Sequence, residues 1–186
     1  MRWKTTVVLL LATVGIGAYI ALYEIKQPTP EQRPRVAKRV ARIPSDTVIR
    51  MTIESPQATL TLTREGTVWH FDPEGFRADP QRISRILAYT ESLFANRILS
   101  DSAEQPLEPS MFGLDPAVGR LTLLTDEGET TLHFGEATAV AGYRYLQRAD
   151  RPEVFIIATG LFDAINQPLE TFRAQEEDAG DESDQP

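Results

Sequence analysis

The stretch that decides the fold is TVIRMTIESPQATLTLTREGTVWHF, residues 47–71. Apolar and polar side chains alternate through Val48–Glu54, with Ile49 on the apolar side, and alternate again through Gln57–Thr63. A period of two is the pattern of a half-buried strand. Glu65-Gly66 then indicates a turn into a third strand. We therefore predict an antiparallel meander of three strands.

A helix is predicted next. Asp79-Pro80 combines a capping carboxylate with proline at the first helical position. Apolar residues then recur at spacings of three and four from Ile83 as far as Ile98. This spacing predicts one amphipathic helix of about five turns that ends near Ile98.

A second group of strands follows a polar connection over residues 100–117. Strand patterns cover residues 121–123, 132–134, 143–148 and 153–158, and a final helical stretch begins near Thr159 and is interrupted at Pro168. We predict an α+β fold of two strand-rich halves, with about seven mostly antiparallel strands, each half followed by a helix.

The N-terminal region contains a candidate membrane span. Thr5–Tyr23 is a run of 19 residues without charge, which as a helix reaches roughly 28 Å, close to the ~30 Å hydrocarbon core. A cleaved signal peptide is the alternative, but Tyr19 makes the best small-residue cleavage site poor. We favour an uncleaved anchor. Its orientation stays open, because basic residues flank both ends.

The charge is distributed unevenly along the chain. The 19 basic and 27 acidic residues give a net charge of −8, with about +6 on residues 1–42 and −6 on the last twelve residues. The basic cluster Arg33–Arg42 has two open readings, contact with anionic headgroups or a solvated tether. The predicted organisation is a cytoplasmic tip (1–4), a transmembrane anchor (5–23), a basic proline-containing linker (24–44), a soluble α+β domain (45–174) and a disordered acidic tail (175–186).

Composition excludes several classes of function. The chain has no cysteine, so disulfides and thiolate chemistry are excluded. An acidic body argues against a nucleic-acid partner. We predict no cofactor and no metal site.

The candidate site residues are few. His70 and His133 are the only histidines, and strand alternation turns both away from the apolar faces, so we interpret them as surface residues. Asp115 is the carboxylate with the least complete local explanation, and a hydrolase that uses it or a histidine is one hypothesis. Tyr143 and Tyr145 share one face of a predicted strand and form a possible interaction surface.

Several segments in order resemble one family. They include TVIRMTI, GTVWHF, RADPQRISRIL, MFGLDPA, LHFGEA, YRYLQRAD, EVFIIA and PLETFR. Together they resemble the bacterial domain-of-unknown-function-4340 family, whose members are single-pass membrane proteins often encoded beside ABC-transporter components of the gliding-motility type. The most telling motif is the turn of Phe112, Gly113, Leu114, Asp115 and Pro116. We interpret it as structural, with Gly113 in an unusual backbone conformation and Leu114 in the core.

The resemblance implies a domain on the extracytoplasmic side of the bacterial inner membrane. It carries no catalytic residues to this chain. We therefore expect a non-enzymatic, membrane-anchored accessory of an ABC-type transport or envelope complex with a protein partner. The alternatives are a module that binds a small molecule or glycan in a groove between the two halves, and the hydrolase.

Overall fold

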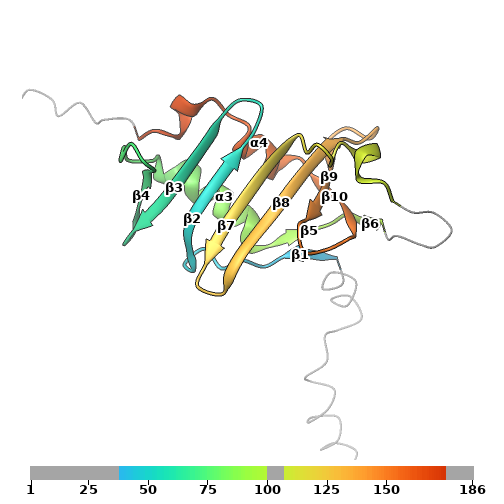
Figure 1. The fold of residues 1–186 in the computed structure, drawn as a ribbon, viewed down its shortest axis with the longest axis horizontal. Coiled ribbons are helices and arrows are strands. Elements are labelled where there is room, and N and C mark those ends of the chain that lie inside the picture. Colours follow the sequence, from blue (N-terminus) through green and yellow to red (C-terminus); the bar gives the residue numbers. More distant parts are fainter. Residues whose placement is uncertain (1–37, 100–106, 175–186) are drawn as a thin grey trace, which may run out of the picture. The chain divides into compact units, whose positions relative to one another are not determined.

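The computed structural model describes residues 38–99 and 107–174 (Figure 1). In chain order the elements of this part are β1 (Arg39–Ala41), β2 (Val48–Glu54), β3 (Thr59–Glu65), β4 (Val68–Phe71), α3 (Pro80–Glu91), β5 (Leu93–Phe94), β6 (Arg97–Leu99), η2 (Pro109–Phe112), β7 (Gly119–Thr125), β8 (Gly128–Ala137), β9 (Tyr143–Arg148), β10 (Val154–Ala158), α4 (Gly160–Ile165) and η3 (Leu169–Phe172).

The predicted anchor at 5–23, most of the linker and the acidic tail lie outside these residues. No helix of the described ranges has both the length and the apolar character needed to cross a membrane.

Eight strands form one antiparallel sheet in the order β4-β3-β2-β7-β8-β9-β10-β6, and β1 pairs with β5 in a separate ribbon (Figure 1). The mostly antiparallel α+β fold predicted from the alternation is therefore confirmed. The two predicted halves join directly, because β2 pairs with β7, with Met51 opposite Leu123 and Ile53 opposite Leu121. Along these strands no groove separates the halves, so the groove expected by the ligand-binding alternative is absent there.

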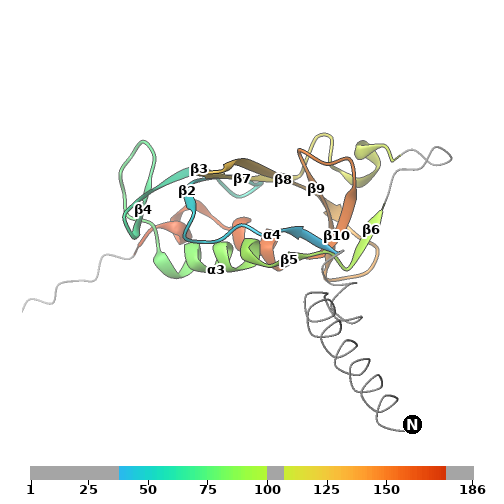
Figure 2. The ribbon, with the colours of Figure 1, turned by 90° about the horizontal axis from the view of Figure 1, so that it is seen from below.

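The helices lie against one face of the sheet (Figure 2). Helix α3 buries Ile83 and Ile86, and α4 buries Phe162, whose ring centroid lies 5.5 Å from that of Phe134 in β8. These side chains and the inward residues of the strands form one apolar cluster. Burial of this surface is the main contribution to stability, at about 25 cal/mol per Å² of apolar area.

Helix α3 is shorter than predicted. Its start is as expected, since the Asp79 carboxylate accepts hydrogen bonds from the backbone of Gln81 and Arg82. It ends at Glu91 rather than near Ile98. Beyond that point Leu93 and Ala95 are buried, and Phe94 between them and Asn96 after them are exposed. Apolar spacing alone could not separate this pattern from a further helical turn, and pairing with β1 and β10 decides it.

The expected orientation of Ile49 is wrong. A register shift between Val48 and Arg50 interrupts the pairing of β2 with β7. An extra residue at such a bulge rotates the following side chains. Ile49 is therefore 41% exposed, while Val48 and Met51 are fully buried.

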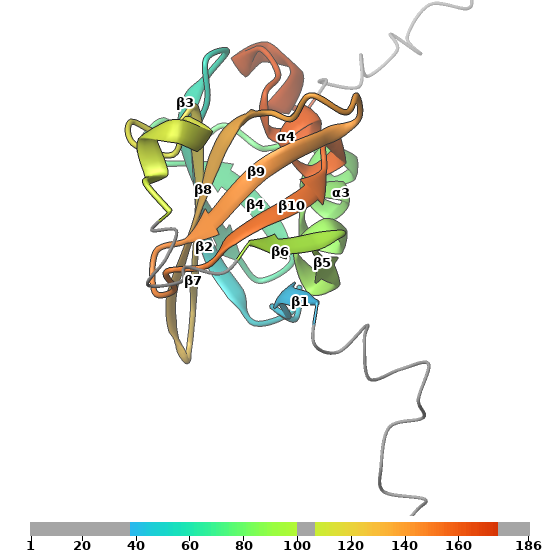
Figure 3. The same ribbon diagram turned by 90° about the vertical axis from the view of Figure 1, so that its right-hand side faces the viewer.

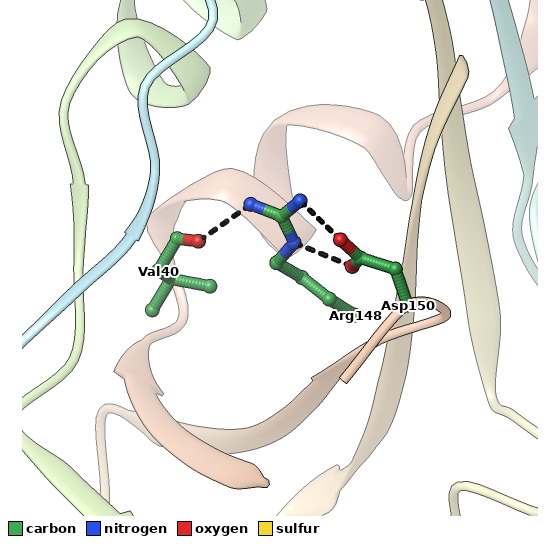
Figure 4. A network of polar contacts seen from close by, with 3 residues as sticks. All are labelled: Val40, Arg148 and Asp150. Carbon is green, nitrogen blue, oxygen red and sulfur yellow. Dashed lines mark hydrogen bonds and ion pairs between the residues drawn. The ribbon is translucent and has the colours of Figure 1, made fainter. Parts of the chain in front are cut away.

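The predicted linker ends earlier than residue 44. Val40, Ala41 and Ile43 are buried in the core, and β1 pairs with β5. The Arg148 guanidinium connects β1 to the sheet by donating a hydrogen bond to the Val40 carbonyl at 3.0 Å. It also donates two hydrogen bonds to the Asp150 carboxylate, at 2.7 and 2.8 Å (Figure 4). The proline content of residues 24–44 hid this short apolar segment, and residues 38–44 belong to the folded domain.

The opposite face of the sheet is polar. Four threonines from neighbouring strands lie in one row across β3, β2, β7 and β8, namely Thr61, Thr52, Thr122 and Thr131. Beside this row Arg120 forms an ion pair with Glu54 at 3.2 Å. Toward β9 this face carries the turn that contains η2, on the side away from the helices (Figure 3).

Candidate functional site

The turn at residues 111–117 has a well-defined backbone. After η2, Gly113 adopts a left-handed conformation with φ 64°, and its N–H donates to the Ser110 carbonyl at 3.2 Å. The N–H of Leu114 donates to the Pro109 carbonyl at 3.0 Å, and the Leu114 side chain is only 3% exposed. The unusual backbone predicted for Gly113 and the burial predicted for Leu114 are both confirmed.

Two glycines allow this turn to lie directly on β8. A Cβ at Gly135 would come within 2.2 Å of the Phe112 carbonyl oxygen, a distance that no side chain tolerates. A Cβ at Gly113 would come within 2.5 Å of Glu136 Cγ and 3.0 Å of the Glu136 backbone nitrogen. Glycine inside a strand commonly marks such a close approach of another backbone.

The turn also contacts β9. The ring of Phe112 packs on that of Tyr145 with centroids 4.9 Å apart and planes inclined by 60°. Tyr143 follows the same side of the strand and is half-buried. The structure therefore brings together the family-like turn and the Tyr143/Tyr145 face, which the sequence indicated separately. We call Met111, Phe112, Tyr143 and Tyr145 the turn–β9 surface.

Met111 is the most exposed large apolar side chain of the described residues, at 73%. Sequence reasoning did not single it out, nor Gly135 and Glu136. The available signal was the glycine in LHFGEA, which interrupts a strand pattern where an exposed side chain would otherwise stand. A glycine at that position indicates that another segment of backbone packs closely on β8.

Arg144 supports the site from the helix side of the sheet. Its guanidinium lies 3.7 Å from the centroid of the Phe162 ring and donates to the Gly135 carbonyl. Burial lowers the pKa of Arg144, and the nearby carboxylates of Asp163 and Glu136 oppose that shift. Gly135 is thus fixed by Arg144 on one side and covered by Phe112 on the other, which makes the base of the turn rigid.

The two histidines do not form a common site. His70 lies on β4 and His133 on β8, with three strands between them, so about 19 Å separates them at the usual strand spacing. Both side chains point away from the apolar faces of their strands, as predicted. Burial lowers the pKa of His133, helped by the charge of Arg120 and opposed by that of Glu54.

Asp115 is exposed at the end of the turn. Within the described ranges, no hydrogen bond or ion pair joins it to either histidine, and no cluster of three metal-ligating side chains occurs. The hydrolase hypothesis therefore has no assembled residue set in this part of the chain.

An open hollow lies between α3 and the β3–β4 hairpin. It has a volume of about 300 Å³ and is lined by residues that include Trp69, Leu87 and Arg64. This is at the small end of ligand pockets. The Arg64 guanidinium is already used, since it donates to the Gly66, Asp46 and Val48 carbonyls.

The fold and the site define a class of protein. It is a small antiparallel α+β domain with a turn that packs, through two glycines, on the sheet face that carries no helix. The chain belongs to the family described as Domain of unknown function (DUF4340), whose model matches residues 69–177, more than half of the chain. The family resemblance of the sequence is thereby confirmed, and the matched range includes the whole turn–β9 surface. No curated protein and no solved structure matched the chain.

Proposed function

We propose that this protein is a non-enzymatic, membrane-anchored, extracytoplasmic interaction domain that serves as an accessory of an ABC-type transport or envelope complex. The observation that supports the proposal most directly is the packing of the turn at residues 111–117 on β8 and β9. A family-like motif is held rigidly on β8 and β9, and it presents Met111 at 73% exposure beside the Phe112–Tyr145 pair. Aromatic and methionine side chains on a fixed base are typical of protein contact surfaces.

Rigidity supports this role. The backbone of the turn is fixed by the Gly113 and Leu114 hydrogen bonds. It also packs directly on the backbone of Gly135, with no room for a side chain between them. A preorganised surface loses little conformational entropy when a partner binds. Unbranched Met111 can adapt its side chain to the partner while the base stays in place.

The surroundings indicate the chemistry of the partner. Glu108, Asp115 and Glu136 are exposed around the turn, and the segment from residue 107 to 117 contains no basic residue. An apolar centre with an acidic rim favours a partner surface with an apolar side chain flanked by Lys or Arg, because complementary charge accelerates association and sets specificity.

Photo-crosslinking tests the proposal. A photoreactive amino acid replaces Met111 in the full chain in native membranes, and the matched control replaces Val140, which is 64% exposed on the β8–β9 connection. We expect an adduct with a transporter or envelope subunit from position 111 and none from position 140. Equal labelling from both positions, or no subunit adduct from position 111, would contradict the proposal.

A second experiment measures the contribution of the apolar centre. Met111→Asp is expected to weaken co-purification of the crosslinked subunit in mild detergent by tenfold or more, because a charge would have to be desolvated at the contact. Val140→Asp is expected to leave co-purification unchanged. Since both side chains are exposed, neither change should unfold the domain.

A further inference from the structure

Two neighbouring segments of the domain, one at the start of the described residues and one after α3, carry basic residues and no acidic ones. Residues 38–44 and 93–99, which contain β1, β5 and β6, include four basic residues and no acidic one. The rest of the folded domain is acidic overall. Figure 2 shows β1, β5 and β6 together at one end of the domain, with the start of α3 at the other.

Contacts join Lys38 and Arg39 to the segment of β5 and the two residues after it, and the exposed Arg97 follows directly. The Lys38 ammonium donates to the Asn96 carbonyl at 2.9 Å, and the Lys38 carbonyl accepts from Ala95 N–H at 2.7 Å. The Arg39 guanidinium lies 5.4 Å from the centroid of the Phe94 ring, and that ring is 38% exposed. We call Lys38, Arg39, Phe94 and Arg97 the basic ribbon.

Arg42 is left out of this surface for a physical reason. It lines a hollow of about 240 Å³ together with Glu127 and Glu129. Those carboxylates offset its charge locally. The charge of the basic ribbon lies instead on Lys38 and Arg39 at the start of β1 and on Arg97 in β6, and β5 contributes only the Phe94 ring.

We propose that the basic ribbon docks on anionic lipid headgroups of the membrane that holds the anchor, an inference that rests on the membrane anchoring in the proposed function. Lys38, Arg39 and Arg97 supply cations for headgroup phosphates, and Phe94 supplies an aromatic ring suited to the interfacial region. Each cation near such a surface strengthens binding about fivefold.

The chain length allows this contact. Fourteen residues separate the uncharged run that ends at Tyr23 from Lys38. Fourteen residues cannot span more than about 50 Å in any conformation. Among the described elements, β1 is the one nearest in sequence to the predicted anchor.

The contact would fix the orientation of the domain. With the basic ribbon on the membrane, the open face of the sheet and its turn stand to the side, and the turn–β9 surface stays available to a neighbouring protein. The ribbon and the turn–β9 surface share no residue, so each can be disabled without changing the other.

The test uses the full chain in lipid nanodiscs. The chain has no cysteine, so Asn96→Cys gives a single position for a fluorophore beside the basic ribbon, and Gln81→Cys gives a control position at the start of α3. Nanodiscs contain either phosphatidylcholine alone or phosphatidylcholine with about one third phosphatidylglycerol. The measurement is fluorescence quenching by headgroup-labelled lipids.

We expect quenching at position 96 to be at least fivefold stronger in the anionic nanodiscs and to disappear in about 1 M salt, where the Debye length is about 3 Å. Lys38→Gln/Arg39→Gln/Arg97→Gln should abolish the difference between the two lipids. The matched control Arg77→Gln/Arg82→Gln/Arg85→Gln removes the same charge from the region of α3 and should preserve it. Circular dichroism checks that both triple variants fold.

Equal quenching in the two lipids, or equal loss in both triple variants, would overturn the inference. These results would leave crosslinking from Met111 unchanged, so they are distinguishable from failure of the proposed function. A chain that does not co-purify with nanodiscs of either composition would overturn both, because the anchor itself would then be wrong.

Discussion

The aromatic rings of Phe112 and Tyr145 join two parts of the chain that are 33 positions apart, with centroids 4.9 Å apart and planes inclined by 60°. The contact links the last residue of η2 to β9. Tilted aromatic pairs at this separation contribute about 0.5–1.5 kcal/mol beyond the burial of their area.

A double-mutant cycle measures this link. We expect Phe112→Ala and Tyr145→Ala to be coupled by about 0.5–1.5 kcal/mol in the free energy of unfolding, measured by urea denaturation. The control pair is Phe112→Ala with Tyr143→Ala, which should be additive within about 0.5 kcal/mol. Equal coupling in the two cycles would mean that the ring contact adds nothing specific.

The glycine of the turn provides a second prediction. Gly113 and Gly66 have nearly the same positive φ, 64° and 62°, but a Cβ meets Glu136 at Gly113 and nothing within 4 Å at Gly66. Alanine at either position pays the cost of a left-handed residue, about 1–2 kcal/mol. Gly113→Ala should be less stable than Gly66→Ala by a further 1 kcal/mol or so, because Glu136 must move.

Urea denaturation of both alanine variants checks the comparison. Since the backbone strain is shared, the difference between the variants reports the contact alone. Equal destabilisation would show that the turn does not lie tightly on β8.

The strands of the meander were predictable because their burial follows a simple period. Thr59–Glu65 faces the core on one side and solvent on the other, and alternation of residue type records that directly. Residues 93–98 were not predictable in this way. Their apolar spacing satisfies both a helix and a strand, and the choice depends on partners distant in sequence, β1 and β10.

The candidate site was partly predictable for the same reason. The backbone of Gly113 is a local property, and the motif indicated it. The contact of Phe112 with Tyr145 and the approach to Gly135 are long-range, so no local pattern specifies them. The exposure of Met111 follows from that packing rather than from its own neighbours in sequence.

The Arg148–Asp150 pair predicts a pH dependence. The hydrogen bond from Arg148 lowers the pKa of Asp150 below its ordinary value, with burial opposing the shift. An acid whose folded pKa is depressed stabilises the fold above its unfolded pKa of about 3.9, and that contribution is lost as the pH falls through the folded pKa. Asp150→Asn should therefore be less stable than the wild type at neutral pH, and this difference should shrink at pH values below about 4.

Urea denaturation across pH measures this difference. In an Arg148→Met background, Asp150→Asn should show a much smaller dependence, because Arg148 contributes most among the groups that lower the pKa of Asp150. A difference that stays constant down to the lowest pH at which the protein folds would contradict this assignment.

The last prediction concerns how β1 is held. The side chain of Arg148 is 16% exposed, and it is bound to the Val40 carbonyl of β1 as well as to Asp150 (Figure 4). Arg148→Met removes a charged donor and leaves a buried carbonyl without it, so we expect a loss of about 1.5–3 kcal/mol in unfolding free energy. The control Arg120→Met breaks an exposed ion pair with Glu54, and its loss should not exceed about 1 kcal/mol.

Hydrogen exchange separates the local effect from the global one. In Arg148→Met the amides of Arg39–Ala41 should exchange faster relative to those of β2, because β1 then opens without unfolding of the sheet. Arg120→Met should leave that ratio unchanged. If the ratio is unchanged in Arg148→Met as well, the pairing of β1 with β5 holds the strand by itself, and the guanidinium only adds to global stability.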